Sequence, residues 1–187
     1  MHEIALFKIA VVGESLVGKT SIIQALLSGG TKFSKNYVMT SDVAVNVKDI
    51  IIPESKDVVE LLLYDSAGNI LYEDFLPKFW NGLNAAFVVF DVTSKESYNS
   101  IRKWVDMVKT VQEPATDEAS DCSIPGVVFA NKTDLVDRRI ISSDEGNFVA
   151  SHLGFGYFEG TAKNSISVDE AFTYLAKEMH NKTNFVV

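Results

Sequence analysis

The sequence predicts a single α/β domain with a mostly parallel sheet, for three reasons. Short apolar runs alternate with stretches of helical periodicity along the 187 residues, an order typical of parallel strands covered by helices. The turn sequence PESKD, residues 53–57, separates two neighbouring apolar runs, so we expect a hairpin with one antiparallel edge strand. Neither a repeat nor a linker divides the chain, and we therefore expect a single domain over residues 1–187.

Each predicted strand is an apolar run bounded by polar or turn residues, and each predicted helix is an amphipathic stretch. We expect six strands, at residues 6–12, 43–52, 58–64, 85–92, 126–130 and 155–158. We expect five helices on both faces of the sheet, at residues 21–27, 71–80, 95–111, 143–152 and 167–180. Ser167 and Glu170 are spaced as in a capping box at the start of the last helix. The polar segment 112–126, with two prolines, is expected to be a surface loop.

Composition excludes several classes of function. The net charge of −8 argues against nucleic-acid binding, which requires a basic face. Cys122 is the only cysteine, so we expect no disulfide within the chain and a reducing, cytoplasmic compartment. A membrane-spanning helix is not expected, since no apolar run approaches about 18 residues. The final residues NKTNFVV contain no cysteine for a prenyl group, so we expect no direct membrane anchor in this chain.

The first predicted strand is followed by GESLVGKT, residues 13–20, which has the Gly-x4-Gly-Lys-Thr pattern of a phosphate-binding loop. We expect its successive backbone N–H groups, and the positive end of the helix that follows, to surround phosphate oxygens. Lys19 would contact the terminal phosphates, and the Thr20 hydroxyl would be a ligand of Mg²⁺. The residues expected at the nucleotide here are Glu14, Ser15, Leu16, Val17, Gly18, Lys19, Thr20 and Ser21.

The sequence NKTD, residues 131–134, indicates which base is bound. Asp134 offers two acceptor oxygens to the ring N–H and exocyclic NH₂ of guanine, a donor pair that adenine lacks. Asn131 would contact the base and tie its loop, and the stem of Lys132 would lie along the face of the base. These residues favour guanine over adenine.

A second contact to the base is expected from EGTAK, residues 159–163, after the last strand. The backbone N–H of Ala162 would donate to the guanine carbonyl oxygen, where adenine carries an amino group. Thr161 and Lys163 flank this N–H and are included in the expected binding site.

The third motif is DSAGN, residues 65–69, at the end of another predicted strand. Asp65 would hold Mg²⁺ through water, and the Gly68 N–H would reach the γ-phosphate. Thr40, between the phosphate-binding loop and the strand that precedes Asp65, is a candidate for a second hydroxyl ligand. The expected metal site therefore consists of Thr20, Thr40 and Asp65.

Taken together and in their order along the chain, these motifs resemble the Ras superfamily of small GTPases and, within it, the Rab branch. The stretch FVVFDVTSKESYNSIRKW, residues 87–104, is similar to Rab sequences at the same place, and the match extends over residues 7–177. More narrowly, KNYVMTSDVAV and YDSAGNILYE resemble the Rab-like small GTPases of intraflagellar transport. The resemblance implies a Ras-like P-loop domain with a six-stranded sheet, one antiparallel edge strand and bound GTP or GDP with Mg²⁺.

The resemblance also implies roles for further residues. Phe33 would pack against the base, and Tyr37 and Thr40 would belong to a first switch. Residues 65–80 would form a second switch. The implied function is that of a molecular switch that docks protein partners in a ciliary transport complex. The resemblance also implies a constitutive heterodimer, located in the cytoplasm and the cilium or flagellum.

Two departures from the family pattern affect catalysis. Asn69 stands where most of the family has the glutamine that orients the attacking water, and its side chain is one methylene shorter. Ser15 replaces a glycine that is common in Ras proteins. Lys19 and Gly68 would still stabilise charge, so we expect GTP binding with slow intrinsic hydrolysis.

Other interpretations stay open at this point. The chain is alternatively a vesicle-traffic Rab whose lipidated tail lies beyond this sequence, or a structural subunit that holds GTP permanently. A phosphate-loop kinase for small molecules fits NKTD poorly. The apolar stripe of the 71–84 segment is either a core-facing helix strained by Pro77 or an exposed docking surface. Its members are Leu71, Tyr72, Phe75, Leu76, Phe79 and Trp80.

Overall fold

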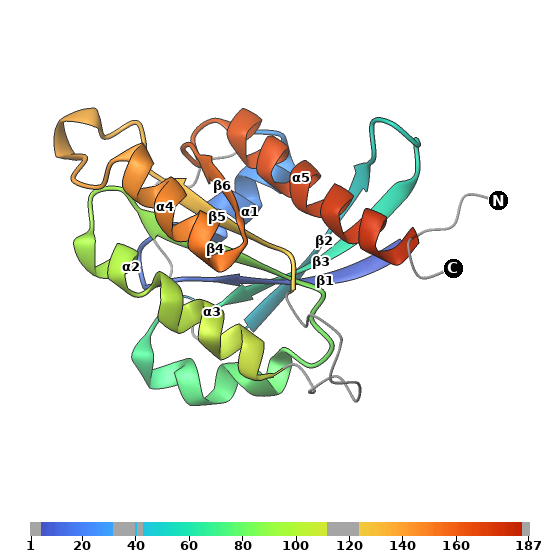
Figure 1. Cartoon of the computed structure of the whole chain (residues 1–187), viewed down its shortest axis with the longest axis horizontal. Helices are drawn as coiled ribbons and strands as arrows, with labels where there is room; N and C mark the ends of the chain where they lie inside the picture. The colour runs from blue at the N-terminus through green and yellow to red at the C-terminus, as the bar shows by residue number, and fades with distance from the viewer. Residues whose placement is uncertain (1–4, 32–39, 41–42, 112–123, 185–187) are drawn as a thin grey trace.

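A six-stranded sheet lies between two layers of helices in the computed structural model, which describes residues 5–31, 40, 43–111 and 124–184 (Figure 1). The strands are β1 (Ala5–Val12), β2 (Val43–Ile51), β3 (Val58–Ser66), β4 (Ala85–Asp91), β5 (Gly126–Asn131) and β6 (Gly156–Glu159). Their order across the sheet is β2-β3-β1-β4-β5-β6. Only the β2–β3 pair is antiparallel among the strand pairs of the described residues, which confirms the predicted fold class.

Five α-helices and two 3₁₀ helices occur within the described residues. They are α1 (Lys19–Ser28), η1 (Ile70–Phe79), α2 (Lys95–Asn99), α3 (Ile101–Thr110), η2 (Val136–Arg138), α4 (Ser143–Leu153) and α5 (Ser165–Asn184). Figure 1 shows α1 and α5 on one side of the sheet and α3 on the other. Apolar side chains fill both interfaces, with Phe87 of β4 stacked on Phe172 of α5 at 4.2 Å between ring centroids. None of the helices within the described ranges is long and apolar enough to cross a bilayer.

The connectivity determines where a ligand site lies. β1 pairs with β3 on one side and with β4 on the other, all parallel, so the chain winds outward in two directions from β1. In such sheets, the loops at the carboxyl ends of the strands diverge and leave a crevice that binds ligands. The segments that follow β1, β3, β5 and β6 carry the predicted motifs, and all of them meet at this edge.

The predicted helix over residues 71–80 is the 3₁₀ helix η1 and not an α-helix. Pro77 lies inside it and has no backbone N–H to donate to an α-helical hydrogen bond. The Trp80 N–H bonds instead to the Pro77 carbonyl oxygen, three residues back, at 3.2 Å. The proline therefore favours the tighter 3₁₀ winding.

The predicted single helix over residues 95–111 is interrupted at Ser100, which separates α2 from α3. The Ser97 hydroxyl bonds to the Ser94 carbonyl oxygen at 3.0 Å, and the Ser100 hydroxyl bonds to that of Ser97 at 3.0 Å. Such side-chain bonds compete with the backbone ladder and interrupt helices.

The last helix begins two residues earlier than predicted. The Asn164 side chain caps it by accepting from the Ile166 N–H at 3.0 Å. Ser167 lies inside the helix and packs against Gly160, where a Cβ atom would come within 2.7 Å of the Ser167 Cβ. The predicted capping box at Ser167 is therefore wrong. Most of the predicted loop 112–126 lies outside the described residues, and β5 begins at its last residue, Gly126.

Candidate functional site

The loop between β1 and α1 has a backbone shape that requires its two glycines. Gly13 has φ 141°, and a Cβ there would lie 2.2 Å from the Val89 carbonyl oxygen. Gly18 has φ 100°, and its Cβ would lie 2.4 Å from Asn131 Nδ2. Both positions combine a left-handed backbone with a close neighbour, so any side chain would displace the loop.

Lys19 begins α1 and folds back under the loop. Its Nζ donates to the carbonyl oxygens of Gly13 and Glu14 at 2.8 and 2.9 Å. The residue is 7% exposed, and burial lowers the pKa of Lys19 to about 8, although Asp65 and Glu14 act in the opposite direction. A buried ammonium of this kind is stabilised when an anion joins it.

Thr20, Thr40 and Asp65 come together beside Lys19. Thr20 Oγ1 donates to Asp65 Oδ2 at 2.6 Å and lies 3.2 Å from Thr40 Oγ1. Asp65 Oδ1 is buried and is the one such side-chain atom of the described residues without a hydrogen-bond partner. Burial raises the pKa of Asp65, against the effects of Thr20 and Lys19. An unpartnered buried carboxylate oxygen is costly, and a hard cation would compensate it.

This oxygen-rich cluster has the donor set that Mg²⁺ prefers, two hydroxyls and a carboxylate. Within the described ranges, no group of three or more His, Cys, Asp or Glu side chains is placed to hold a metal ion. A metal held here by protein groups would therefore depend on threonine hydroxyls.

Gly68 approaches the same loop from the end of β3. A Cβ at Gly68 would lie 2.4 Å from Lys19 Nζ and 2.6 Å from the Glu14 carbonyl oxygen. Only a glycine allows the backbone after β3 to come this near to the loop.

Asn69 has a structural role that sequence reasoning missed. Its Oδ1 accepts from the Leu71 N–H at 3.0 Å, which makes Asn69 the N-cap of η1. Asparagine is among the preferred residues at this position. The side-chain amide oxygen of Asn69 therefore points to the start of η1.

Asn131 connects three segments on the other side of the site. Its Nδ2 donates to the Val17 carbonyl oxygen at 2.7 Å, and its Oδ1 accepts from the Ala162 N–H at 3.2 Å. Sequence reasoning expected Asn131 to tie its loop, but it assigned the Ala162 N–H to the base. A bound guanine would have to share or take over that N–H.

Lys132 and Asp134 each form an ion pair with another residue of the protein. Lys132, at φ 67°, donates to the Leu16 carbonyl oxygen at 2.7 Å and pairs with Asp91 Oδ2 at 2.6 Å. Asp134 pairs with Lys163. Burial raises the pKa of Asp134, but hydrogen bonds from Lys163 and Thr161 outweigh it and lower the pKa below the usual value. Asp134 is therefore ionised at neutral pH, as an acceptor for two donors must be.

The structure places most of the predicted residues at one edge of the sheet, and their roles in binding stay predictions. Ser15 lies in the turn of the first loop and Ser21 in the first turn of α1. Phe33 and Tyr37 lie outside the described residues.

Sequence reasoning missed Asp91, which ends β4 and holds Lys132. It also missed the carboxylate of Glu159, which Arg139, Tyr157 and Ser143 surround at 2.6, 2.8 and 3.1 Å. A polar residue at the end of an apolar strand was the available signal in both cases.

The apolar stripe of residues 71–80 divides between the two interpretations left open by the sequence. Leu76 and Trp80 are buried against the sheet. Leu71, Phe75 and Phe79 are 74%, 54% and 44% exposed. One side of η1 therefore belongs to the core and the other presents large apolar groups to solvent.

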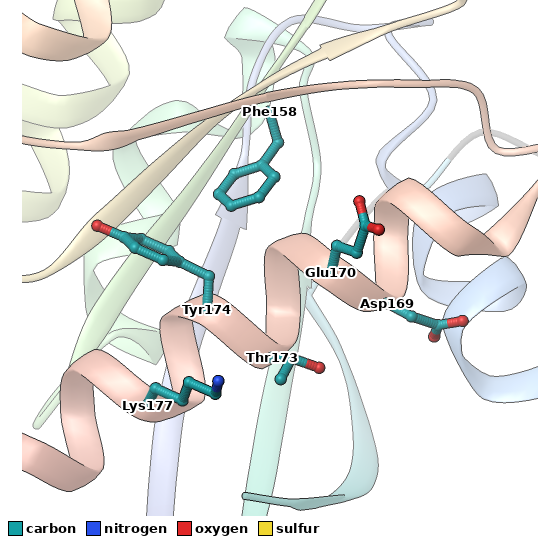
Figure 2. A pocket seen from close by; sticks show the side chains of 6 residues that line it. All are labelled: Phe158, Asp169, Glu170, Thr173, Tyr174 and Lys177. Atoms are coloured by element: carbon teal, nitrogen blue, oxygen red, sulfur yellow. The ribbon is translucent and has the colours of Figure 1, made fainter. Parts of the chain in front are cut away.

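A separate hollow of about 390 Å³ lies between β6 and α5. Figure 2 shows the residues that line it, which are Phe158, Asp169, Glu170, Thr173, Tyr174 and Lys177. The rings of Phe158 and Tyr174 lie 5.3 Å apart between centroids, and Lys177 pairs with Glu54. This hollow shares no lining residue with the predicted nucleotide site.

Comparison with known proteins agrees with this arrangement. The sequence model of the Ras family matches residues 8–181. The human intraflagellar transport protein 27 homolog is 37% identical over 173 residues, 92% of this chain and 89% of the relative. Intraflagellar transport protein 27 of Chlamydomonas reinhardtii is 42% identical over 132 residues, 71% of this chain and 62% of the relative. Human Ras-related protein Rab-3A is 31% identical over 170 residues, 91% of this chain and 72% of the relative.

These matches confirm the resemblance recognised in the sequence, both to Rab proteins and to the GTPases of intraflagellar transport. Ras-family proteins in general bind GTP or GDP together with Mg²⁺. The family model spans nearly the whole chain, and the observed sheet order and strand-end motifs fall within the matched residues. The chain therefore belongs to the Ras family of small GTPases.

Proposed function

We propose that this chain, as a single domain, is a switch that binds GTP or GDP with Mg²⁺. The observation that carries the proposal is that buried Lys19 lies beside the cluster of Thr20, Thr40 and Asp65. A buried ammonium with a lowered pKa lies beside a buried carboxylate whose Oδ1 has no partner among the described residues. A polyphosphate would neutralise the first and a divalent cation the second, so a magnesium nucleotide answers both requirements.

Each residue of the phosphate side has one task in this proposal. Lys19 Nζ turns from the Gly13 and Glu14 carbonyl oxygens toward phosphate oxygens, and the loop N–H groups and the start of α1 complete the cradle. The hydroxyls of Thr20 and Thr40 and the carboxylate of Asp65 would hold Mg²⁺, whose charge would offset the negative charge of the phosphates. Gly68 leaves room for its N–H to approach the terminal phosphate.

Selection of guanine falls to the opposite side of the site. Asp134 is ionised and accepts from both guanine donors, while Asn131 holds the NKTD segment, the first loop and Ala162 in one arrangement. A site that leaves buried polar groups unpaired with the wrong base discriminates by about 10⁴-fold. Lys163 pairs with Asp134, and we expect this pair to help orient the carboxylate toward the edge of the base.

Intrinsic GTP hydrolysis is proposed to be slow. Hydrolysis needs a side chain that orients the attacking water, and Asn69 is one methylene shorter than the usual glutamine. The cap bond from the Leu71 N–H occupies the same Asn69 oxygen that would accept from water. A misplacement of about 1 Å can cost around 10²-fold in rate. Charge stabilisation by Lys19 and Gly68 stays intact, so binding is retained.

We further propose that the switch acts in intraflagellar transport, in the cytoplasm and the cilium, as part of a constitutive heterodimer that docks further partners. Relatives over 92% of the chain carry the name of an intraflagellar transport protein, which supports this role. Exposed Leu71, Phe75 and Phe79 provide an apolar surface beside the nucleotide site. The similarity to Rab-3A supports vesicle traffic as a second candidate. Its mark would be a lipidated cysteine at the C-terminus of the full protein.

The test of nucleotide binding is the content of protein purified without added nucleotide, denatured and analysed by chromatography. We expect close to one GDP or GTP per chain in the native protein and much less in a Lys19→Met variant. Adenine nucleotide, or an empty protein that binds no added GDP, would overturn the proposal. Copurification of the same partner with the native chain and a folded Thr20→Asn variant would support a constitutive complex, and loss of the partner from the variant would contradict it.

A further inference from the structure

Glu14 raises a physical question because it places a carboxylate in the loop that is to hold phosphates. Like charges at such short range repel. The structure shows where this carboxylate lies: Glu14 Oε1 accepts from the indole Nε1–H of Trp104 at 3.3 Å. Trp104 is on α3 and is fully buried, so its position is fixed by the core. The Glu14 side chain is thus held on the α3 side of the loop.

The neighbour of Trp104 holds a second segment of the site. Lys103 Nζ pairs with Glu73 Oε1 at 2.5 Å, and the Glu73 side chain is only 11% exposed. The same ammonium lies 5.6 Å from the centre of the Trp104 ring, in reach of a cation–π interaction. Glu73 belongs to η1. Lys103 and Trp104, which we call the α3 pair, therefore hold η1 and the first loop at the same time.

The two segments that the α3 pair holds also touch each other. The backbone of Gly68, just before η1, lies so near Glu14 that a Cβ atom would be 2.6 Å from its carbonyl oxygen. That carbonyl oxygen is one of the two acceptors of Lys19 Nζ. A movement of Glu14 therefore changes both the surroundings of Lys19 and the space left for Gly68.

We propose that Lys103 and Trp104 are positioning residues that slow the release of bound nucleotide by holding Glu14 and η1 in place. The inference rests on the proposed function, because it concerns the nucleotide of that same site. Without the indole N–H, the Glu14 carboxylate becomes free to approach the phosphates and repel them, and the carbonyl oxygen beside Lys19 loses its fixed position. Without Lys103, η1 loses its tie to α3.

The experiment measures the dissociation rate of a fluorescent GDP analogue from the native chain and from variants, in Mg²⁺ and excess unlabelled GDP. A hydrogen bond to a charged group has a net worth that corresponds to roughly 10-fold or more, so we expect Trp104→Phe to release nucleotide about 10-fold faster. Glu14→Ala loses the tie but also the repelling charge, and is expected to show a smaller increase. Glu14→Gln keeps an acceptor for the indole and should release nucleotide more slowly than Trp104→Phe.

Lys103→Met keeps the aliphatic stem and loses the pair with Glu73, for which we expect a few-fold faster release. Lys109→Ala, an exposed lysine on the same helix, is the matched control and should leave the rate unchanged. The decisive variant is Glu14→Ala combined with Trp104→Phe. If Trp104 acts through Glu14, the second change adds nothing to the rate of Glu14→Ala.

Two results would overturn the inference. One is that Glu14→Ala and Lys103→Met release nucleotide at the native rate, a test that does not depend on how well Trp104→Phe folds. The other is that Trp104→Phe speeds release equally with and without Glu14, which would make its effect one of core packing. Failure of the native chain to hold any guanine nucleotide is a different outcome, which overturns the proposed function and this inference with it.

Discussion

The phosphate side and the base side of the site differ in how completely the protein satisfies its own charged groups. On the base side, Asn131 has two hydrogen-bond partners. Lys132 pairs with Asp91, Asp134 pairs with Lys163, and the pKa of Asp134 is lowered. On the phosphate side, burial lowers the pKa of Lys19 and raises that of Asp65, whose Oδ1 has no partner among the described residues. Each side thus has charges of both signs, but only the base side has paired them.

This difference separates preorganisation from dependence on a ligand. The base side keeps its shape through contacts within the protein, so we expect it to discriminate between bases with little rearrangement beyond the Ala162 N–H, which bonds to Asn131 and which guanine would share or take over. The phosphate side holds groups whose charged forms are disfavoured until an anion and a cation arrive. We therefore expect ligand binding to stabilise the phosphate side more than the base side. Substitutions on the two sides should also differ in their effects on nucleotide affinity, base preference and stability.

The largest expected effect is that of Lys19→Met. Truncating one partner of a buried charge pair costs 2–5 kcal/mol, so we expect GDP affinity to fall by about 10³-fold. The nucleotide-free variant should be no less stable than the native chain. The pKa of Lys19 in the folded chain, about 8, is below its usual value of 10.5, so at pH 7 its charge opposes folding.

Fluorescence titration with a GDP analogue measures the loss of affinity, and urea unfolding of the nucleotide-free proteins measures stability. Lys109→Met, on the exposed face of α3, controls for loss of a positive charge. If the nucleotide-free Lys19→Met chain unfolds at a much lower urea concentration than the native chain, Lys19 stabilises the fold. The phosphate side would then not depend on its ligand in the way that we infer.

The next effect concerns the base side. Asp134→Asn replaces an acceptor oxygen by a donor, so one guanine donor is left facing an N–H group. We expect GDP affinity to fall by about 10²-fold, because a guanine donor that is buried on binding and left unsatisfied costs about 1–3 kcal/mol. Xanthine nucleotide, which carries an oxygen at the position of the guanine amino group, should bind better to the variant than to the native chain.

Competition of GDP and XDP for the labelled site measures this preference. Asp137→Asn, an exposed carboxylate of η2, is the control for the change in charge. Unchanged preference in Asp134→Asn would mean that the pair with Lys163, and not a base contact, is the whole role of Asp134.

A smaller effect is expected for hydrolysis. Asn69→Gln adds reach toward the water but loses a preferred cap residue, so we expect about 10-fold faster single-turnover hydrolysis, part of what a 1 Å correction can give. Asn69→Ala should hydrolyse GTP at nearly the native rate and lose only the cap bond to Leu71. Single-turnover release of phosphate from preloaded GTP provides the measurement. A large slowing in Asn69→Ala would show that Asn69 positions the water after all, and an unaltered rate in Asn69→Gln would direct attention to Ser15.

The sequence predicted the fold class and the local motifs, and the reason is that both are encoded within short stretches. Continuous apolar runs mark β1, β4 and β5, and the glycines of residues 13–18 fix a loop through the backbone alone. The break at Ser100 was not predicted, because the apolar periodicity continues through it while the Ser100 hydroxyl bonds to the Ser97 carbonyl oxygen. The 3₁₀ form of η1 was not predicted either, although Pro77 was noted.

Contacts between distant polar residues were the part that the sequence did not predict. Trp104 and Glu14 are 90 positions apart, and neither has a motif that names the other. The cluster around Glu159 joins residues from the connection after β5, from α4 and from β6, and only the three-dimensional fold brings them together. Such contacts support the motif residues without belonging to the motifs.

The smallest expected effect tests whether the paired state of the base side contributes to stability. Burial raises the pKa of Glu159, but hydrogen bonds from Arg139, Tyr157 and Ser143 outweigh it and lower the pKa below its usual value of 4.5. A carboxyl group with a lowered folded pKa stabilises the fold above its unfolded pKa, and this contribution is lost as the pH falls through the folded value. At pH 7, Glu159→Gln should therefore lower the free energy of unfolding by about 1 kcal/mol, a modest value because the side chain is 33% exposed. Below pH 4.5 the difference between variant and native chain should shrink.

Urea unfolding of the GDP-bound proteins at pH 7 and pH 4 measures both, with Glu170→Gln on α5 as the control for charge. A difference that stays constant between the two pH values would mean that the shape of the Glu159 side chain matters and its charge does not, and the base side would then owe its order to packing and not to paired charges.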